Sequence, residues 1–200
     1  MNLYSISPES FSDREVEDIL ALLDAGLDAY HLRKPGASEE ELADLLSALP
    51  EVARQRIVLH QHYGLVKTFG LGGYHVKDCE SSERALSAAR IAGTTLSRSV
   101  HSLSQLRAMS SSLDYAFLSP VFASISKSGY EPQWSASALL SALKTVKETS
   151  RISVCALGGI DAAKALIAKE MGFDGLVLHG ALWNAADPVG VLREIREAVA

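Results

Sequence analysis

Small hydroxyl groups and one ammonium group follow a short apolar run in the segment LSPVFASISKSGY, residues 118–130. Ser124 and Ser126 can donate hydrogen bonds to the oxygens of an anion, and the Lys127 ammonium can neutralise its charge. Gly129 allows the loop to bend over a ligand. We therefore expect this segment to bind a phosphate group, the alternative being an ordinary solvated loop rich in serine.

Two turns that contain glycine give a second indication of phosphate binding. The sequence LGGID includes Gly158 and Gly159, and the sequence HGALWN includes His179 and Gly180. Glycine lets the backbone approach a ligand closely, and the N–H groups at the start of a helix carry a partial positive charge. The alternative is turn chemistry alone, because Gly-Gly before a helix is common.

The six histidines share one kind of position in the chain. All of them fall in or directly after a predicted strand, and none falls in a predicted helix. Any single histidine more often has a structural role, but the group as a whole favours a polar pocket. The spacing His60-x-His62 is only a weak signal for a metal cluster. The six are His31, His60, His62, His75, His101 and His179.

Eight short apolar runs alternate with amphipathic segments along the chain. Their starts lie about 24 residues apart, which fits a strand, a helix and two short loops. Strands that are apolar on both faces and alternate with helices indicate a parallel sheet. We expect a single-domain (β/α)8 TIM barrel over residues 1–200, the alternative being an open doubly wound sheet with fewer strands. The runs are 3–7, 29–33, 56–60, 73–77, 94–99, 115–122, 152–158 and 174–180.

In such a barrel the active site lies at the carboxyl ends of the strands. Polar and charged side chains follow the second to fifth predicted strands, in addition to the glycine turns after the seventh and eighth. The predicted site therefore draws on residues that are far apart in the sequence. The polar residues of the second to fifth predicted strand ends are Arg33, Lys34, His60, Gln61, His75, Glu80, Ser99 and His101.

Composition limits the kinds of partner. The net charge of −5 argues against general nucleic-acid binding, which usually needs a basic face. We see no signal peptide in MNLYSISPES and no run of about 18 apolar residues that would predict a membrane span. We therefore expect a cytoplasmic protein that binds small phosphorylated molecules, with a homodimer left open as its oligomeric state.

Several motifs resemble those of thiamine phosphate synthases and the related thiazole tautomerases, from YHLRKPG to LHGALWNAADPV. The segment SPVFASISK, residues 119–127, is similar to the family's Gly-Pro-(Ile/Val)-(Tyr/Phe)-x-Thr-x-Thr-Lys. The segments GYH at 73–75, SVH at 99–101 and LGGI at 157–160 look like three further family motifs. The segment around 119–127 is the most specific of these.

The resemblance implies a transferase that joins hydroxymethylpyrimidine pyrophosphate to thiazole phosphate, with Mg²⁺, and releases pyrophosphate. It implies that Arg33 and Lys127 hold the pyrophosphate and that Ser99 touches the pyrimidine or the departing group. It also implies a thiazole-phosphate site. The residues that would form that site are Ser124, Ser126, Gly159, His179 and Gly180.

The chain departs from the family pattern in the half that would hold pyrophosphate. The family's two aspartate ligands of Mg²⁺ correspond to Gln61 and Glu80, and its glutamine and asparagine correspond to His31 and His60. Mg²⁺ prefers carboxylate ligands, so the change to glutamine weakens the expected metal site. Two alternatives to a synthase stay open. One is a tautomerase in which His31, His60 or His101 acts as the general base, and the other is a non-catalytic binder of a thiazole phosphate.

Overall fold

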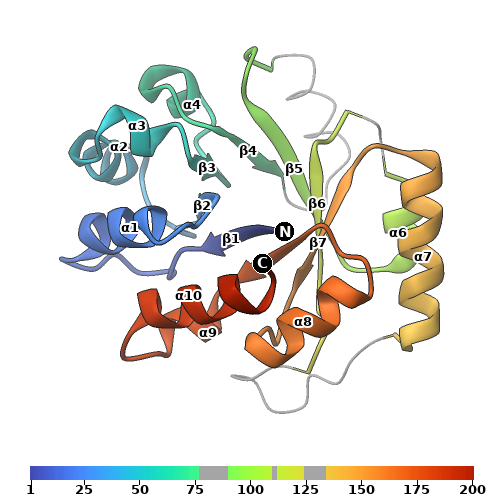
Figure 1. The fold of residues 1–200 in the computed structure, drawn as a ribbon. Helices are drawn as coiled ribbons and strands as arrows, with labels where there is room; N and C mark the ends of the chain where they lie inside the picture. Colours follow the sequence, from blue (N-terminus) through green and yellow to red (C-terminus); the bar gives the residue numbers. More distant parts are fainter. Residues whose placement is uncertain (77–89, 110–111, 124–133) are drawn as a thin grey trace.

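The parallel strands of the protein close into a barrel with helices on the outside (Figure 1). The computed structural model describes residues 1–76, 90–109, 112–123 and 134–200. Each strand pairs in parallel with the next, and β8 pairs with β1. The predicted TIM barrel is therefore confirmed, and the open doubly wound sheet is wrong.

Each of the eight predicted apolar runs overlaps one observed strand. The sixth strand is shorter than predicted because it ends before Ser119 and Pro120, and proline has no N–H group to donate to a neighbouring strand. The strands are β1 (Asn2–Ile6), β2 (Ala29–Leu32), β3 (Ile57–Leu59), β4 (Gly73–Val76), β5 (Thr95–Val100), β6 (Tyr115–Leu118), β7 (Ser153–Leu157) and β8 (Gly175–Leu178).

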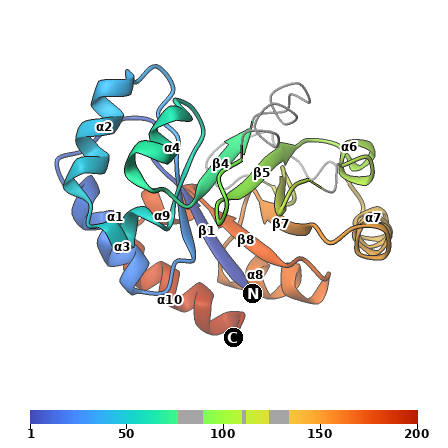
Figure 2. The ribbon, with the colours of Figure 1, turned by 90° about the horizontal axis from the view of Figure 1, so that it is seen from above.

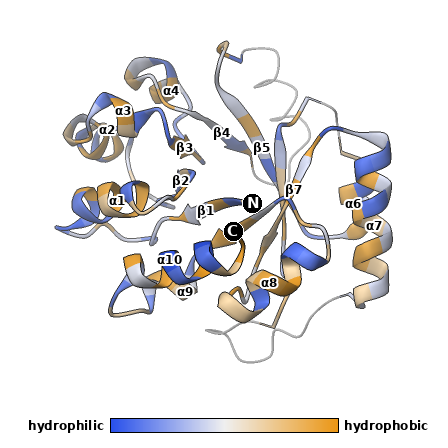
Figure 3. Ribbon diagram, in the orientation of Figure 1, coloured by the Kyte–Doolittle hydropathy of each residue, from blue (hydrophilic) through white to orange (hydrophobic). Residues whose placement is uncertain are grey.

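Five of the described helices, α2, α6, α7, α8 and α10, begin at a serine or aspartate whose side chain caps the first turn. Ser38 and Glu41 form a capping box at the start of α2, and Pro188 occupies the first turn of α10. Helices such as α7 and α10 carry both hydrophilic and hydrophobic residues (Figure 3). The described helices are α1 (Glu15–Asp24), α2 (Glu39–Ala48), α3 (Glu51–Arg54), α4 (Gly64–Phe69), α6 (Leu103–Arg107), α7 (Ala136–Thr149), α8 (Ala162–Glu170), α9 (Gly180–Trp183) and α10 (Pro188–Ala198).

Buried apolar side chains form two separate groups. The larger group fills the layer between the strands and the surrounding helices. The smaller group lies inside the barrel and consists of Tyr4, Tyr115, Phe117, Cys155 and Val177. These five residues belong to β1, β6, β7 and β8, so the apolar filling is on one side of the barrel interior. The other side, along β2 to β5, is available for polar side chains.

Pairing of the first strand with the last one closes the barrel and brings the chain ends together. The register aligns Asn2 of β1 with Gly175 of β8. The two termini lie close to each other in both ribbon views (Figures 1 and 2). None of the described helices has the length and apolar character needed to cross a bilayer.

Candidate active site

Strand register brings three histidines to the polar side of the barrel interior. Paired residues of neighbouring strands have side chains on the same face of a sheet. β2 and β3 align His31 with Val58. β3 and β4 align Leu59 with Tyr74, so the next residues, His60 and His75, lie side by side. All three histidines are buried, with exposed fractions of 0% for His31, 7% for His60 and 1% for His75. The predicted polar pocket is therefore partly an internal cluster, which we call the histidine cluster.

His31 connects this cluster to the apolar side of the barrel. Its Nδ1 atom lies 3.1 Å from His60 Nε2, and its Nε2 atom lies 3.0 Å from the hydroxyl of Tyr115. Burial lowers the pKa of His31 well below its usual value, and the neighbouring His75 lowers it further. His31 is therefore a neutral imidazole with a partner for each ring nitrogen.

His75 is held by two serine hydroxyls of β5. Its Nδ1 atom lies 2.8 Å from Ser97 Oγ, and its Nε2 atom lies 2.9 Å from Ser99 Oγ. Burial lowers the pKa of His75 to about 3, so this ring is also neutral near pH 7. Ser99 is only partly buried, and it therefore links the histidine cluster to the open end of the barrel.

The guanidinium of Arg33 lies at the carboxyl end of β2, where the sequence predicts an anion site. Its Nη1 atom lies 2.6 Å from Glu9 Oε1, and the arginine side chain is 34% exposed. An exposed ion pair of this kind contributes little to stability. The guanidinium of Arg33 lies at the end of β2 with an anionic oxygen already beside it.

Lys34 is buried against the start of α1, and its ammonium is already paired, contrary to its predicted place among the ligand-binding groups. Its ammonium lies 2.7 Å from Glu15 Oε2 and 2.7 Å from the carbonyl oxygen of Ser10. Lys34 is completely buried, and Tyr30 also hydrogen-bonds Glu15. Removing one partner of a buried ion pair strongly lowers the free energy of unfolding. The Lys34 ammonium therefore stabilises the start of α1.

Gln61 occupies the predicted metal-binding position after β3. Its side-chain Nε2 donates a hydrogen bond to the carbonyl of Lys34, which leaves a neutral amide oxygen as the atom that could face a cation. The second predicted ligand, Glu80, lies outside the described residues. The described part of the chain therefore supplies one neutral oxygen toward the expected Mg²⁺ site, which does not by itself fit the carboxylate preference of that ion.

The glycine turn after β7 holds two loops together. Gly158 and Gly159 have positive φ angles of 102° and 65°, which favour glycine. A Cβ atom on Gly159 would meet the carbonyl oxygen of Ala123, and one on Gly158 would lie 3.2 Å from Pro120. These glycines therefore allow the loop after β7 to pack closely against the segment after β6, which is a different reason from the predicted close approach to a ligand.

A short extra helix, α9, follows β8 at the same end of the barrel. His179 precedes it and is exposed, and Gly180 is its first residue. Trp183 Nε1 donates a hydrogen bond of 2.7 Å to the carbonyl of Ile6, which attaches α9 to the end of β1. A phosphate site in TIM barrels is frequently formed by the loops after strands 7 and 8 and such a helix.

Several predicted site residues do not join the histidine cluster. His101 is exposed, with its Nδ1 atom 3.2 Å from the carbonyl oxygen of Ser119. His62 has a positive φ of 51° and its Nε2 atom lies 3.0 Å from the carbonyl oxygen of Ala37. The predictions for Ser124, Ser126 and Lys127 fall outside the described residues.

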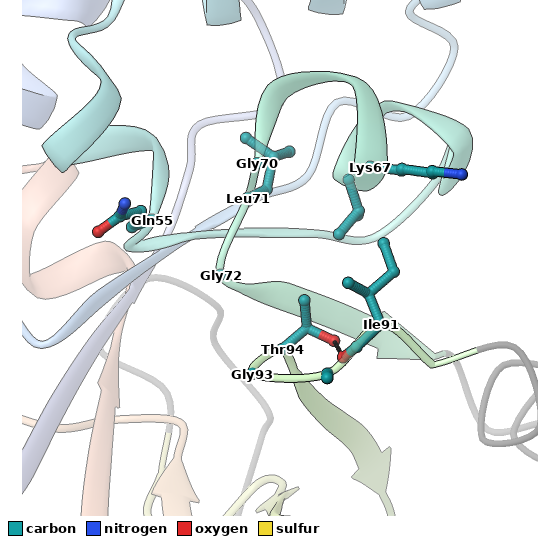
Figure 4. A pocket seen from close by; sticks show the side chains of 10 residues that line it. Gln55, Lys67, Gly70, Leu71, Gly72, Ile91, Gly93 and Thr94 are labelled. Carbon is teal, nitrogen blue, oxygen red and sulfur yellow. Dashed lines mark hydrogen bonds between the residues drawn. The ribbon is translucent and has the colours of Figure 1, made fainter.

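A cavity of about 430 Å³ lies at the opposite end of the barrel (Figure 4). Its lining includes Gln55, Gly72 and Thr94, which precede β3, β4 and β5. The amino ends of TIM-barrel strands serve stability, whereas active sites lie at the carboxyl ends. We therefore do not assign the reaction to this cavity.

Comparison with known proteins identifies the family to which the chain belongs. The family model described as thiamine monophosphate synthase matches residues 3–182. The chain belongs to the thiamine monophosphate synthase family. Thiamine-phosphate synthase of Psychrobacter sp. (strain PRwf-1) is 30% identical over 86% of this chain and 82% of its own. The crystal structure of thiamine phosphate pyrophosphorylase from Bacteroides thetaiotaomicron has a TM-score of 0.81 and 30% identity, over 99% of this chain and 97% of that one.

Three structural features of the site were not predicted from the sequence. Tyr115 looked like an ordinary buried strand residue, yet its hydroxyl contacts His31. Ser97 of β5 pairs with His75 of β4. Glu15 forms an ion pair with Lys34. The alternation of β5, in which Ser97 and Ser99 share a face, is a signal that could have identified the two serines as inward-facing.

Proposed function

We propose that the protein joins hydroxymethylpyrimidine pyrophosphate to thiazole phosphate, forming thiamine phosphate and releasing pyrophosphate. The observation that carries this proposal is the family match over residues 3–182 on a closed parallel barrel. The carboxyl ends of all the strands of such a barrel meet at one end. Arg33, Ser99, Gly159 and Gly180 each lie at or just beyond one of these ends, so they surround one space.

The reaction breaks the bond between the pyrimidine methylene carbon and the pyrophosphate oxygen, and the thiazole nitrogen then forms a bond to that carbon. The leaving group carries the electron pair of the broken bond, and no strong base is required. Catalysis depends on charge neutralisation and on the relative position of the two substrates. These are tasks that guanidinium, hydroxyl and backbone N–H groups can perform.

Arg33 is suited to neutralise the departing pyrophosphate. Its side chain is partly exposed at the end of β2, and it is already paired with a carboxylate oxygen of Glu9, which shows that the guanidinium can hold an anionic oxygen there. The Ser99 hydroxyl is held by His75 Nε2, and it can donate a hydrogen bond at the reacting centre in the His75 tautomer that carries its proton on Nε2. The Lys127 ammonium is proposed to assist Arg33 on the resemblance of SPVFASISK alone.

The thiazole phosphate is proposed to bind between the turn after β7 and the start of α9. Gly158 and Gly159 present backbone N–H groups in a turn that has no side chains, and α9 begins at Gly180. Ser124 and Ser126 are proposed to complete the site from the neighbouring loop. The tight packing of Gly159 against Ala123 supports this arrangement because it keeps the two loops adjacent.

Mg²⁺ remains a proposed cofactor that would supply positive charge to neutralise the phosphate groups when bound. Gln61 and Glu80 are the proposed ligands, and no step is assigned to the ion here because the described residues offer only the neutral oxygen of Gln61. The phosphorylated substrates are highly charged and do not cross membranes unaided. For that reason we propose the cytoplasm as the location of the reaction.

Pyrophosphate release tests the proposed function. The purified chain is incubated with both precursors, with each precursor alone, and with both precursors in the absence of Mg²⁺. We expect release only when both precursors are present, and a rate about 100-fold lower for Arg33→Gln. Arg14→Gln is the matched control, since Arg14 is 77% exposed and pairs with Glu17 on the surface.

Three outcomes would overturn the proposal. Absence of release from the unaltered chain with both precursors would exclude the transferase reaction. Isomerisation of a thiazole phosphate without pyrophosphate would favour the tautomerase. Thermal stabilisation by thiazole phosphate without any turnover would favour the non-catalytic binder.

A further inference from the structure

The histidine cluster is a concentration of metal-binding side chains in the interior of the barrel. His31, His60 and His75 each offer a ring nitrogen, and these three nitrogens all lie within 4.8 Å of one another. The three residues come from β2, the end of β3 and β4, which are neighbouring strands. We propose that the cluster is a binding site for one divalent transition-metal ion of the zinc type.

The present spacing is close to that of a zinc site. Four-coordinate zinc binds histidine nitrogens at about 2.0–2.1 Å, which separates two such nitrogens by about 3.3 Å. His31 Nδ1 and His60 Nε2 are already 3.1 Å apart. The rings of His60 and His75 are stacked at 4.2 Å, so metal binding requires a turn of the His75 ring toward the other two.

The hydrogen bonds around the cluster match those of metal-binding histidines. Such a histidine usually donates its second ring N–H to a nearby oxygen, which fixes the orientation of the ring. If His31 binds the ion through Nδ1, its Nε2 atom keeps the Tyr115 hydroxyl as partner at 3.0 Å. His75 has Ser97 and Ser99 at 2.8 and 2.9 Å from its two nitrogens, so a serine hydroxyl lies near whichever nitrogen does not bind the ion.

The ligand type determines which metal ion the cluster would accept. Imidazole nitrogens suit zinc, copper, nickel and iron, whereas Mg²⁺ requires oxygen ligands. The cluster is therefore distinct from the proposed magnesium ligands Gln61 and Glu80, and the inference does not depend on the proposed reaction. The fourth ligand would be water or an anionic oxygen that enters from the end of the barrel, where Ser99 is partly exposed.

An apolar ring packs against the histidine cluster from the other side of the barrel interior. The Phe117 ring lies 4.6 Å from the His31 ring and 4.7 Å from the His75 ring. Burial of three imidazoles among such neighbours costs free energy unless each nitrogen has a partner. A metal ion would replace the contact between His31 Nδ1 and His60 Nε2 with one bond to each of these two nitrogens.

Metal retention by the full-length chain tests the proposal without any substrate. The protein is treated with a chelator, exposed to Zn²⁺ or Co²⁺, and dialysed in the presence of excess Mg²⁺. We expect one equivalent of Zn²⁺ or Co²⁺ to remain, and we expect the visible absorption of the Co²⁺ form to show four-coordinate geometry. Anomalous diffraction from crystals of the Zn²⁺ form should place one ion among the three imidazoles.

Two substitutions with amide side chains remove single ligands. His31→Gln and His60→Asn retain hydrogen-bonding ability and introduce the residues that the resemblance gives to the family at these positions. We expect each to weaken metal affinity more than about 100-fold, since even the loss of an outer partner costs 10–100-fold. His62→Asn is the matched control, because asparagine tolerates its positive φ of 51° and His62 lies outside the cluster.

The proposal is wrong if the unaltered chain retains less than one equivalent, because the cluster would then be a hydrogen-bonded network only. It is equally wrong if the anomalous peak lies elsewhere or if the retained Co²⁺ is six-coordinate. Equal affinity in His31→Gln and in the unaltered chain would also contradict it, provided that circular dichroism shows both to be folded. Failure of pyrophosphate release would leave the metal measurement unaffected, so the two proposals fail separately.

Discussion

His75 Nε2 and Ser99 Oγ lie 2.9 Å apart, across the boundary between the closed interior of the barrel and its open end. The histidine is 1% exposed and the serine is partly exposed. A buried imidazole therefore fixes the orientation of a hydroxyl that substrate can reach. This pair connects the packing of the barrel to the proposed chemistry.

Loss of this hydrogen bond should affect turnover in a way that is not additive. We expect Ser99→Ala and His75→Phe each to lower kcat/KM for pyrophosphate release by about 10–100-fold. The double variant should be no slower than the slower single variant, because both changes remove the same interaction. Ser99→Ala combined with His62→Asn is the control, and there the two effects should add. Additive losses for the Ser99 and His75 changes would show that the two side chains act independently.

The buried ion pair of Lys34 and Glu15 should contribute to stability rather than to binding. Lys34→Met leaves the Glu15 carboxylate buried without its partner, and we expect a loss of about 3–5 kcal/mol in the free energy of unfolding. Glu15→Gln added to Lys34→Met removes the uncompensated charge and should recover part of this loss. Denaturant unfolding measures both effects. A Lys34→Met protein of unchanged stability but greatly raised KM would support the sequence-based prediction of a ligand contact.

Stability should decrease at mildly acidic pH in the metal-free protein. Burial lowers the pKa of His31 and lowers that of His75 to about 3, so the unfolded chain binds more protons than the folded one between about pH 3 and 6.5. Unfolding free energy should therefore fall as the pH drops through this range, by up to about 1.4 kcal/mol per pH unit for each histidine. Urea unfolding of the chelator-treated chain between pH 7 and pH 4 measures the slope.

The histidine variants provide the comparison for this slope. His75→Phe and His31→Gln each remove one group that titrates, so each should flatten the dependence on pH. His101→Gln, at an exposed position, should leave it unchanged. A slope that is the same in all of these chains would mean that the buried histidines do not cause the loss of stability.

Gly159 should tolerate no side chain. Gly159→Ala places a Cβ atom against the carbonyl of Ala123 in a backbone with φ of 65°, so the loops after β6 and β7 must separate. We expect a loss of more than about 1 kcal/mol in stability and a raised KM for thiazole phosphate. Gly36→Ala is the control, because its φ of 88° carries the same backbone penalty while no heavy atom lies within 4 Å of the new Cβ. Equal effects of the two substitutions would rule out the loop contact.

The barrel could be predicted from the sequence because each strand is encoded locally. Buried strands such as YAFL at 115–118 and SVCAL at 153–157 have apolar residues on both faces, and amphipathic helices separate them. Once the strands are counted, the rule that parallel connections are right-handed leaves few topologies. The position of the active end follows from the rule that such barrels carry their sites at the carboxyl ends of the strands, without any knowledge of side-chain contacts.

The internal contacts could not be predicted because they depend on register and on depth along the strands. His31 and His75 lie within strands near their carboxyl ends and are buried, whereas His101 follows the end of β5 and is exposed. The Lys34–Glu15 pair joins residues from two different segments, and nothing in either segment indicates the other. Arg33 and Lys34 are adjacent in sequence, yet one pairs with the exposed Glu9 and the other with the buried Glu15.

Direct detection of the product is the decisive measurement for the proposed function. The purified chain is incubated with hydroxymethylpyrimidine pyrophosphate, thiazole phosphate and Mg²⁺, and the mixture is analysed by liquid chromatography and mass spectrometry. We predict that thiamine phosphate accumulates with an equal amount of pyrophosphate, and that Arg33→Gln slows both together. Unchanged precursors after prolonged incubation with a folded, unaltered chain would contradict this account.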